Sequence, residues 1–241
     1  MEKQNYVIIN SVSFSYGKKE IIKNVSLSLK QGEVWGLVGP NGAGKTTLLK
    51  IISGLYCPGS GYVIINGLNM SKDTNSAYKK LGIQIEDTAA YEHLTGYDNL
   101  KILFNMYDEK ECENSALELL SLVGLKDVAY EKFKTYSLGM KKRLGIAMAL
   151  INKPSILILD EPTNGLDIDG IRTVRRIVKE YAKETGATIL ISSHITSELE
   201  NTCDNIAFLI DGEIRSVNSI HDFANITIED YYVNLLEDKN A

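Results

Sequence analysis

The most informative stretch of this chain is Gly39-Pro40-Asn41-Gly42-Ala43-Gly44-Lys45-Thr46. Its spacing matches G-x-x-x-x-G-K-[ST], the loop that wraps phosphate groups. The apolar run at residues 33–38 predicts a short buried strand before the loop, and residues 46–52 predict the start of a helix after it. Since the motif needs a strand before it and a helix after it, this context weakens the alternative of a chance match on a glycine-rich turn.

Phosphate binding by this loop has a direct physical basis. Glycines let the backbone curl so that several N–H groups converge on one anion. The following helix contributes the positive end of its dipole. Lys45 supplies a charge for the β- and γ-phosphates, and the hydroxyl of Thr46 is expected to bind Mg²⁺. The loop therefore predicts a nucleotide site that includes Mg²⁺.

Composition narrows the class of protein. The chain has 241 residues, of which 44% are hydrophobic and 24% charged, as in a soluble globular protein of one or two domains. Its net charge of −5 argues against a nucleic-acid partner. The basic cluster Lys141-Lys142-Arg143 is therefore interpreted as the solvated face of a helix. No run approaches the ~18 apolar residues of a spanning helix, so a role at a membrane would require a partner.

Hydrophobic periodicity predicts an α/β fold with an antiparallel β-subdomain at its N-terminus. Residues 5–30 alternate with period two, as half-buried antiparallel strands do, and residues 17–20 are the expected turn between two of them. Short apolar runs at residues 156–159 and 188–192 are typical of strands buried on both faces of a parallel sheet. The phosphate-binding loop is thus expected in a P-loop NTPase core.

A helical pattern interrupts this core. One predicted helix begins near Thr95 and turns Tyr107 toward its apolar face. The domain is expected to span residues 1–220, with residues 87–152 as a helical subdomain inserted in it and residues 221–241 as a short C-terminal tail.

Two carboxylates follow the apolar run at residues 156–159. Asp160 and Glu161 are predicted at the carboxyl end of a strand, where ligands bind in open parallel sheets. Asp160 would hold Mg²⁺, and Glu161 would take a proton from an attacking water as general base. The alternative is a pair of exposed turn carboxylates before Pro162. The phosphate-binding loop in the same chain favours the functional interpretation.

An aromatic residue and a histidine also lie at predicted strand ends. Tyr16 precedes Gly17, so its ring either stacks on a nucleotide base or packs across the strands, and the local pattern favours packing. His194 follows the strand predicted at residues 188–192. A lone histidine is usually structural, but this one is expected at the sheet edge that holds the phosphates. On position alone, a γ-phosphate contact and a structural role remain equal alternatives.

These motifs occur in one order, and together they resemble an ATP-binding cassette (ABC) ATPase over about residues 5–220. The resemblance implies that adenine stacks on Tyr16 and that His194 is the switch histidine of the family. It also makes Asp160 the Mg²⁺-binding aspartate and Glu161 the catalytic glutamate. The other ATP-binding residues that it implies are those of the loop: Gly39, Asn41, Gly42, Ala43, Gly44, Lys45, Thr46 and Thr47.

Two motifs depart from the usual pattern of the family. Its signature, usually Leu-Ser-Gly-Gly-Gln, reads Tyr136-Ser137-Leu138-Gly139-Met140 in this chain. Ser137 and Gly139 still offer a hydroxyl, a backbone N–H and a helix start to a phosphate. The glutamine of the Q-loop falls on Glu86, whose oxygen can bind Mg²⁺ or water but which donates no hydrogen bond when ionised. The metal ligands implied are therefore Thr46, Glu86 and Asp160.

These departures resemble the branch of the family that serves bacitracin resistance and lantibiotic self-immunity. The resemblance implies an ATPase that powers export of a peptide antibiotic or related amphipathic compound by a separate integral-membrane subunit. It implies a second ATPase subunit, expected to be identical, with two ATP molecules held between the P-loop of one subunit and the signature of the other. The expected location is cytoplasmic, peripheral on the inner face of the cell membrane.

Two other classes of function are alternatives. A soluble ABC ATPase of translation or DNA repair usually carries two cassettes or a long coiled-coil insert, and neither pattern occurs in this sequence. A regulator that binds ATP without hydrolysing it is disfavoured by the presence of Lys45, Asp160, Glu161 and His194. The transporter ATPase is therefore the expected function.

Overall fold

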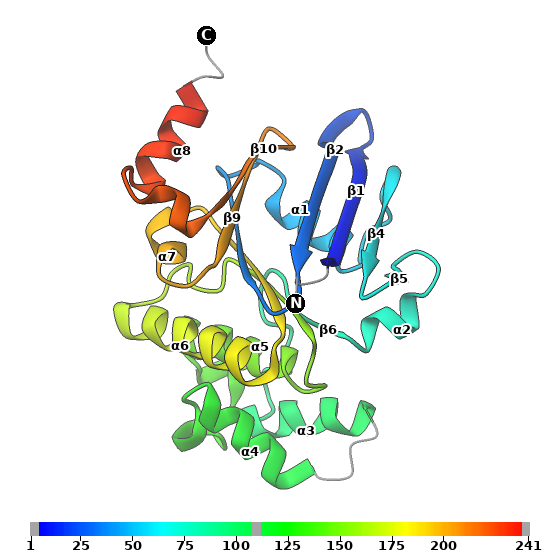
Figure 1. The fold of residues 1–241 in the computed structure, drawn as a ribbon. Coiled ribbons are helices and arrows are strands. Elements are labelled where there is room, and N and C mark those ends of the chain that lie inside the picture. Colours follow the sequence, from blue (N-terminus) through cyan, green and yellow to red (C-terminus); the bar gives the residue numbers. More distant parts are fainter. Residues whose placement is uncertain (1–4, 108–111, 238–241) are drawn as a thin grey trace.

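The computed structural model describes residues 5–107 and 112–237 (Figure 1). Its centre is a six-stranded sheet in the order β10-β9-β3-β8-β7-β6. Five of these strands run parallel, and β10 is antiparallel to β9. The strand bounds are β3 Val34–Val38, β6 Leu81–Gln84, β7 Ile156–Asp160, β8 Thr188–Ser193, β9 Asn205–Ile210 and β10 Glu213–Ser219.

The central strands are buried on both faces, as the apolar runs predicted. Every residue of β3, β7 and β8 is buried. Alternate residues enter different cores, so Leu157 and Leu159 pack on one face of the sheet while Ile156 and Ile158 pack on the other. This arrangement is typical of a parallel sheet covered on both sides. It leaves the carboxyl ends of the strands as the exposed edge at which polar residues gather.

An antiparallel sheet forms the N-terminal part of the fold, in the order β2-β1-β4-β5. Its strands are β1 Asn5–Tyr16, β2 Lys19–Lys30, β4 Ser60–Ile65 and β5 Leu68–Asn69. The predicted turn at residues 17–20 is shorter in the structure, because Tyr16 pairs directly with Lys19. The alternating segments before it form one strand with irregular register between Ile9 and Val12. The antiparallel subdomain is confirmed.

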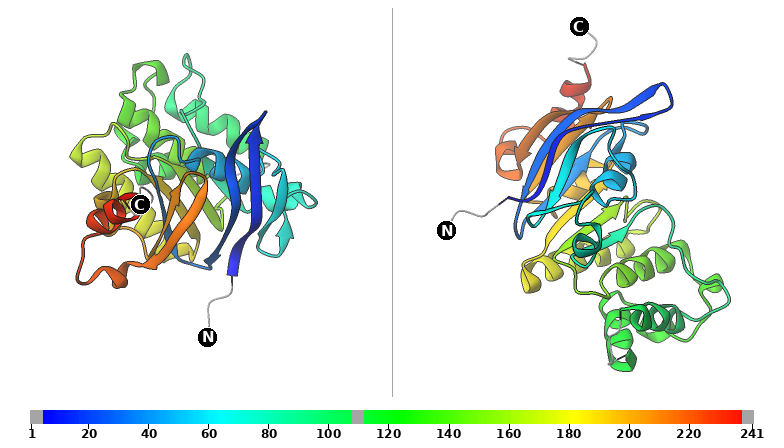
Figure 2. Two further views of the ribbon diagram at one scale, coloured as in Figure 1. Left: turned by 90° about the horizontal axis from the view of Figure 1, so that it is seen from above. Right: turned by 90° about the vertical axis from the view of Figure 1, so that its right-hand side faces the viewer.

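Helices cover the sheets and build a separate lobe. In Figure 1 and the right-hand view of Figure 2, α3 and α4 lie at the end of the molecule opposite α8. The helix bounds are α1 Lys45–Ile52, α2 Thr74–Tyr78, α3 Gly96–Met106, α4 Cys112–Leu122, α5 Leu138–Ala149, α6 Ile168–Thr185, α7 Thr196–Glu200 and α8 Ile228–Glu237. Three short 3₁₀ helices occur at Lys126–Val128, Phe133–Thr135 and Ile220–Phe223. No helix in the described ranges is long and apolar enough to cross a membrane.

The helix predicted near Thr95 is α3, and its start follows local hydrogen bonding. Thr95 caps the helix, since its Oγ1 accepts from the backbone N–H of Asp98 at 3.0 Å. Phe104 is buried on its apolar face. Tyr107 was expected on that face but is 50% exposed. The helix ends at Met106, so the periodicity of α3 no longer orients the following residue.

The C-terminal segment packs on the central sheet through aromatic rings. Phe208 of β9 lies 5.5 Å from Tyr231 and 5.9 Å from Tyr232, measured between ring centroids. Phe223 also contacts Phe208, at 6.4 Å. The helix that carries the two tyrosines, α8, thereby covers the end of the sheet near β9 and β10 (Figure 1).

Candidate active site

The phosphate-binding loop joins β3 to α1, as its motif predicted. Gly42 and Gly44 have φ angles of 82° and 104°, which only glycine adopts freely. Gly39 approaches another strand so closely that an added Cβ would lie 2.1 Å from the carbonyl oxygen of Leu209. The Nζ of Lys45 donates to the carbonyl of Gly39 at 2.7 Å and is held inside the loop. The glycines therefore determine the backbone conformation of the loop, and that conformation positions the Lys45 ammonium.

Asp160 and Thr46 meet at the edge of the central sheet. The Thr46 hydroxyl donates to Oδ2 of Asp160 at 2.7 Å. The Ser192 hydroxyl donates to Oδ1 of the same carboxylate at 2.5 Å. Ser192 lies opposite Asp160 in the register of β7 and β8. Its hydroxyl also accepts from the backbone N–H of Glu161 at 2.9 Å, so one serine orients both acidic residues.

Ser192 was missed by sequence reasoning. It is a polar residue in an otherwise apolar buried strand, one position before Ser193 and two before His194. That position is the available signal, because a buried hydroxyl requires a hydrogen-bond partner. Identifying Asp160 as the partner requires knowledge that β7 and β8 are neighbours.

Glu161 lies between a cation and an imidazole. Its Oε1 is 3.4 Å from Nζ of Lys45, and its Oε2 is 2.7 Å from Nδ1 of His194. Glu161 has a φ of 45°. Such a conformation costs about 1–3 kcal/mol in a non-glycine residue and is concentrated at functional sites. The carboxylate is 20% exposed, so it is shielded yet accessible to water. This geometry suits a group that accepts a proton from water.

A cleft of about 310 Å³ connects these residues with Tyr16. It is lined by Tyr16, Lys19, Ile21, Asn41, Gly42, Gly44, Lys45, Thr46, Thr47 and Glu161. Gly39 and Ala43 are buried in the loop beneath it. The ring of Tyr16 packs edge-on against Phe14 and Tyr56, with centroids at 5.0 and 6.0 Å, and still borders the cleft. Its two alternative roles, packing and presenting a ring to the cleft, are therefore compatible.

Glu86 follows β6 and is paired with a lysine of α1. Its Oε1 lies 2.5 Å from Nζ of Lys50, and this hydrogen bond raises the pKa of Lys50. Lys50 also lies over the ring of Tyr56, 5.3 Å from its centroid. The Glu86 side chain is 63% exposed and does not line the cleft that contains Lys45. In the structure, Glu86 is therefore paired with Lys50. It takes no part in the hydrogen bond between Thr46 and Asp160.

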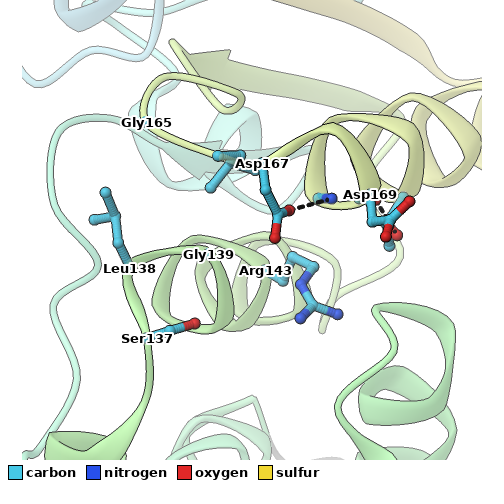
Figure 3. Close-up of a pocket in the computed structure, with 10 residues that line it drawn as sticks. Ser137, Leu138, Gly139, Arg143, Gly165, Asp167 and Asp169 are labelled. Carbon is cyan, nitrogen blue, oxygen red and sulfur yellow. Dashed lines mark hydrogen bonds between the residues drawn. The ribbon is translucent and has the colours of Figure 1, made fainter.

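Ser137 and Gly139 line a different cleft, of about 410 Å³, shown in Figure 3. Ser137 caps α5, since its Oγ accepts from the backbone N–H of Met140 at 3.2 Å. On the facing element, the Asp167 carboxylate accepts from the N–H of Gly170 at 2.8 Å and caps α6. Among the residues that the structure describes, none lines both this cleft and the cleft of Lys45. The predicted site residues around Lys45 and those around Ser137 therefore lie in separate clefts of the chain, and Glu86 lines neither cleft.

The basic cluster at residues 141–143 is not a solvated helix face, and that prediction is wrong. Nζ of Lys142 donates to the carbonyl of Glu161 at 2.8 Å. Nη1 of Arg143 donates at 2.9 Å to two carbonyls, those of Val123 and Gly124. Lys141 lies over an aromatic ring, that of Phe133, at 5.2 Å. Helix α5 is packed between the helical lobe and the strand ends, so Lys142 and Arg143 donate to backbone carbonyls inside the protein.

Comparison with known proteins identifies the family. A family model described as ABC transporter matches residues 22–164. The lantibiotic transport ATP-binding protein SrtF of Streptococcus pyogenes is 45% identical over 206 residues, which cover 86% of this chain and 87% of that protein. The bacitracin transport ATP-binding protein BcrA of Enterococcus faecalis is 40% identical over 210 residues, covering 87% of this chain and 68% of the relative.

Solved structures support the same assignment. The structure of an ATP binding subunit of an ABC transporter superposes with a TM-score of 0.87 at 28% identity, covering 96% of this chain and 99% of the other. A dimeric post-hydrolysis state of an ATP-binding cassette bound to ADP and Pi has a TM-score of 0.81 at 29% identity, covering 89% and 98%. The chain therefore belongs to the ABC transporter family and is an ATP-binding cassette ATPase.

Proposed function

We propose that this chain powers an exporter that removes a peptide antibiotic, or a related amphipathic compound, through a separate integral-membrane subunit. The observation that carries the proposal is the arrangement of Lys45, Glu161 and His194 in a chain 40–45% identical to lantibiotic and bacitracin transport ATP-binding proteins. The relatives named for transport favour this function over a soluble ATPase of translation or DNA repair. The proposed location is the cytoplasmic face of the cell membrane, where this chain would bind the membrane subunit.

The proposed reaction uses groups already held in place. Backbone N–H groups of the loop and the Lys45 ammonium would bind the β- and γ-phosphates. A water oxygen would attack the γ-phosphorus while Glu161 accepts the water proton. The bond from the γ-phosphorus to the bridging oxygen then breaks, and ADP leaves with that electron pair. His194, whose Nδ1 is 2.7 Å from Glu161, would orient the carboxylate and contact the transferred phosphate.

Mg²⁺ fits the residues at the sheet edge. The Thr46 hydroxyl and the Asp160 carboxylate lie 2.7 Å apart and offer the oxygen ligands that Mg²⁺ prefers. Mg²⁺ usually takes one or two carboxylates together with phosphates and water, so a small protein contribution is sufficient. When bound, the ion would neutralise charge on the β- and γ-phosphates. Glu86 is the proposed third ligand, and it would have to exchange Lys50 for the metal.

The proposed working unit contains two identical subunits. Ser137 and Gly139 lie in a cleft of their own, and the start of α5 there can bind a phosphate. If the phosphate-binding loop of a second copy faced the start of α5, the two anion-binding surfaces would enclose one ATP between them. Hydrolysis and phosphate release would then let the two subunits part and drive the membrane subunit. The dimeric state of a similar ATP-binding cassette bound to ADP and Pi supports the pairing of two subunits.

Recovery of the tagged chain from its native membranes tests the proposed function. We expect it to copurify with an integral-membrane protein, and we expect vesicles reconstituted with both proteins to release a lipid-bound peptide antibiotic when ATP is added. The Glu161→Gln variant is the matched control, because it should copurify equally well and release no peptide. Copurification with ribosomes or DNA, and normal antibiotic resistance in cells that lack the chain, would contradict the proposal.

A further inference from the structure

Lys142 connects α5, the helix that begins after Ser137, to Glu161, the proposed base that follows β7. It lies in α5, one turn beyond Ser137, and its Nζ donates to the carbonyl of Glu161 at 2.8 Å. It lines neither of the clefts that contain Lys45 and Ser137. Its amine therefore contacts the backbone of the proposed base and lines neither cleft.

The Glu161 peptide is held from several sides. Ser192 accepts its N–H, and its carbonyl accepts from the backbone N–H of Asn164 at 3.2 Å as well as from Lys142. Glu161 has a left-handed φ of 45°, which is uncommon without glycine and persists only when surrounding contacts enforce it. A donor on the carbonyl fixes the following peptide plane. The direction of the Glu161 side chain depends on this backbone.

Several carboxylates surround Lys142. Burial holds the pKa of Lys142 below its usual value, and the carboxylates of Glu161, Asp87, Asp160 and Glu198 offset part of this lowering. The lysine is thus half-buried among four acidic side chains. A neutral side chain of similar length would leave these carboxylates without this cation and the Glu161 carbonyl without this donor.

The backbone of the same helix turn is tied to the segment at residues 84–88. Gln84 donates its Nε2 to the carbonyl of Lys142 at 3.0 Å, and the Thr88 hydroxyl donates to the carbonyl of Lys141 at 2.9 Å. A Cβ added to Gly145 would lie 2.5 Å from Oγ1 of Thr88 and 2.8 Å from Nε2 of Gln84. At Gly145 the helix and the segment are therefore in close contact, and the two side-chain hydrogen bonds join them, so we expect a shift of one to displace the other.

We propose that Lys142 is a positioning residue: it holds the Glu161 backbone in its reactive orientation and links it to the segment at residues 84–88. Movement of that segment, which carries Glu86, is thereby transmitted through α5 to the proposed base. The inference rests on the proposed role of Glu161. It adds a residue that acts through the base without touching ATP.

Lys142→Met removes the donor and the charge while keeping an unbranched side chain. We expect the kcat of ATP hydrolysis to fall about 10-fold, since a hydrogen bond from a charged group is lost, while the Kd for ATP stays within about twofold. Lys142→Arg should restore most of the rate. The matched control is Lys141→Met, which alters the neighbouring cation over Phe133 and should leave kcat within about twofold of wild type.

Two further comparisons separate positioning from a general structural effect. Because Lys142 acts through Glu161, Lys142→Met should not slow the residual reaction of Glu161→Gln any further. Combining it with Thr88→Val should give an effect on kcat smaller than the product of the single effects, because both variants break the same link. If Lys142→Met does not fold, Lys142→Gln, whose amide is too short to reach the Glu161 carbonyl, replaces it with the same expectations.

The outcomes distinguish this inference from the proposed function. A kcat unchanged by Lys142→Met would overturn the positioning role, as would an equal loss in the Glu161→Gln background. Independent effects of Lys142→Met and Thr88→Val would overturn the link to residues 84–88. Wild-type turnover by Glu161→Gln alone would instead overturn the proposed role of the base.

Discussion

The two clefts of this chain differ in how completely one subunit builds them. In the cleft of Lys45, charged and polar groups from several elements contact one another, with Glu161 between Lys45 and His194. In the cleft of Ser137, the polar side chains mainly cap their own helices, as Ser137 does for α5 and Asp167 for α6. We propose acid–base chemistry for the first cleft and binding of an anion at a helix start for the second. This difference suggests that chemistry belongs to one cleft and recognition of a second subunit to the other.

Lys45→Ala should have the largest effect, because it removes the cation at the centre of the chemical cleft. We expect the rate of ATP hydrolysis to fall at least about 100-fold, as when a group that stabilises transition-state charge is removed. Phosphate release and ATP affinity are the measurements. Lys183→Ala, an exposed lysine on α6, is the matched control and should retain wild-type activity. Activity within about tenfold of wild type in Lys45→Ala would show that the cleft is wrongly assigned.

Ser137→Ala should have an intermediate effect and should separate recognition from chemistry. The loss of the cap costs about 1 kcal/mol of stability. ATP binding by a single subunit should be unchanged, while ATP-dependent dimerisation weakens about 10-fold through loss of the hydroxyl contact. Analytical ultracentrifugation with ATP measures the dimer.

Thr95→Ala is the control for the lost cap. Thr95 caps α3 through the same kind of contact, a hydroxyl that accepts a backbone N–H. It lies outside both clefts. Its substitution should lower the free energy of unfolding by a similar amount and leave the dimer intact. An equal loss of dimerisation in both variants would reduce the role of Ser137 to helix capping.

Glu86→Gln should have the smallest effect on hydrolysis. Glu86 is 63% exposed, so its pair with Lys50 contributes at most about 1 kcal/mol to stability and is weakened by salt. The pair raises the pKa of Lys50, so this contribution is present at neutral pH and declines as pH rises above the usual pKa of lysine. ATPase activity should remain substantial while antibiotic resistance changes. Unchanged resistance would remove the proposed coupling role of Glu86.

The sequence predicted most reliably what short-range spacing determines. The loop at residues 39–46, the buried strands β7 and β8 and the start of α3 near Thr95 depend on glycine placement, apolar runs and capping, and all were confirmed. Tyr107 was misplaced because periodicity does not indicate where a helix ends. The turn after Tyr16 is shorter than the pattern predicts because strand pairing reaches as far as Lys19.

The sequence did not predict contacts between segments that are distant along the chain. The hydrogen bond of Ser192 to Asp160 depends on strand order, which local patterns do not determine. The sequence predicts a solvated Lys142 because the carbonyl that accepts its hydrogen bond belongs to Glu161, 19 residues further along the chain at the end of a strand. The pairing of Lys50 with Glu86 likewise requires the tertiary arrangement of α1 and β6. In each case the sequence shows the polar residue but does not indicate which residue it pairs with.

The oligomeric state of Glu161→Gln tests most directly whether the two clefts complete each other. With ATP present, this variant should lose hydrolysis and accumulate as a dimer that contains two ATP molecules, whereas ADP should leave it monomeric. Adding Ser137→Ala to the same chain should weaken that dimer. Native mass spectrometry counts both subunits and nucleotides. A monomer with ATP fully bound, or hydrolysis at the wild-type rate, would contradict the account.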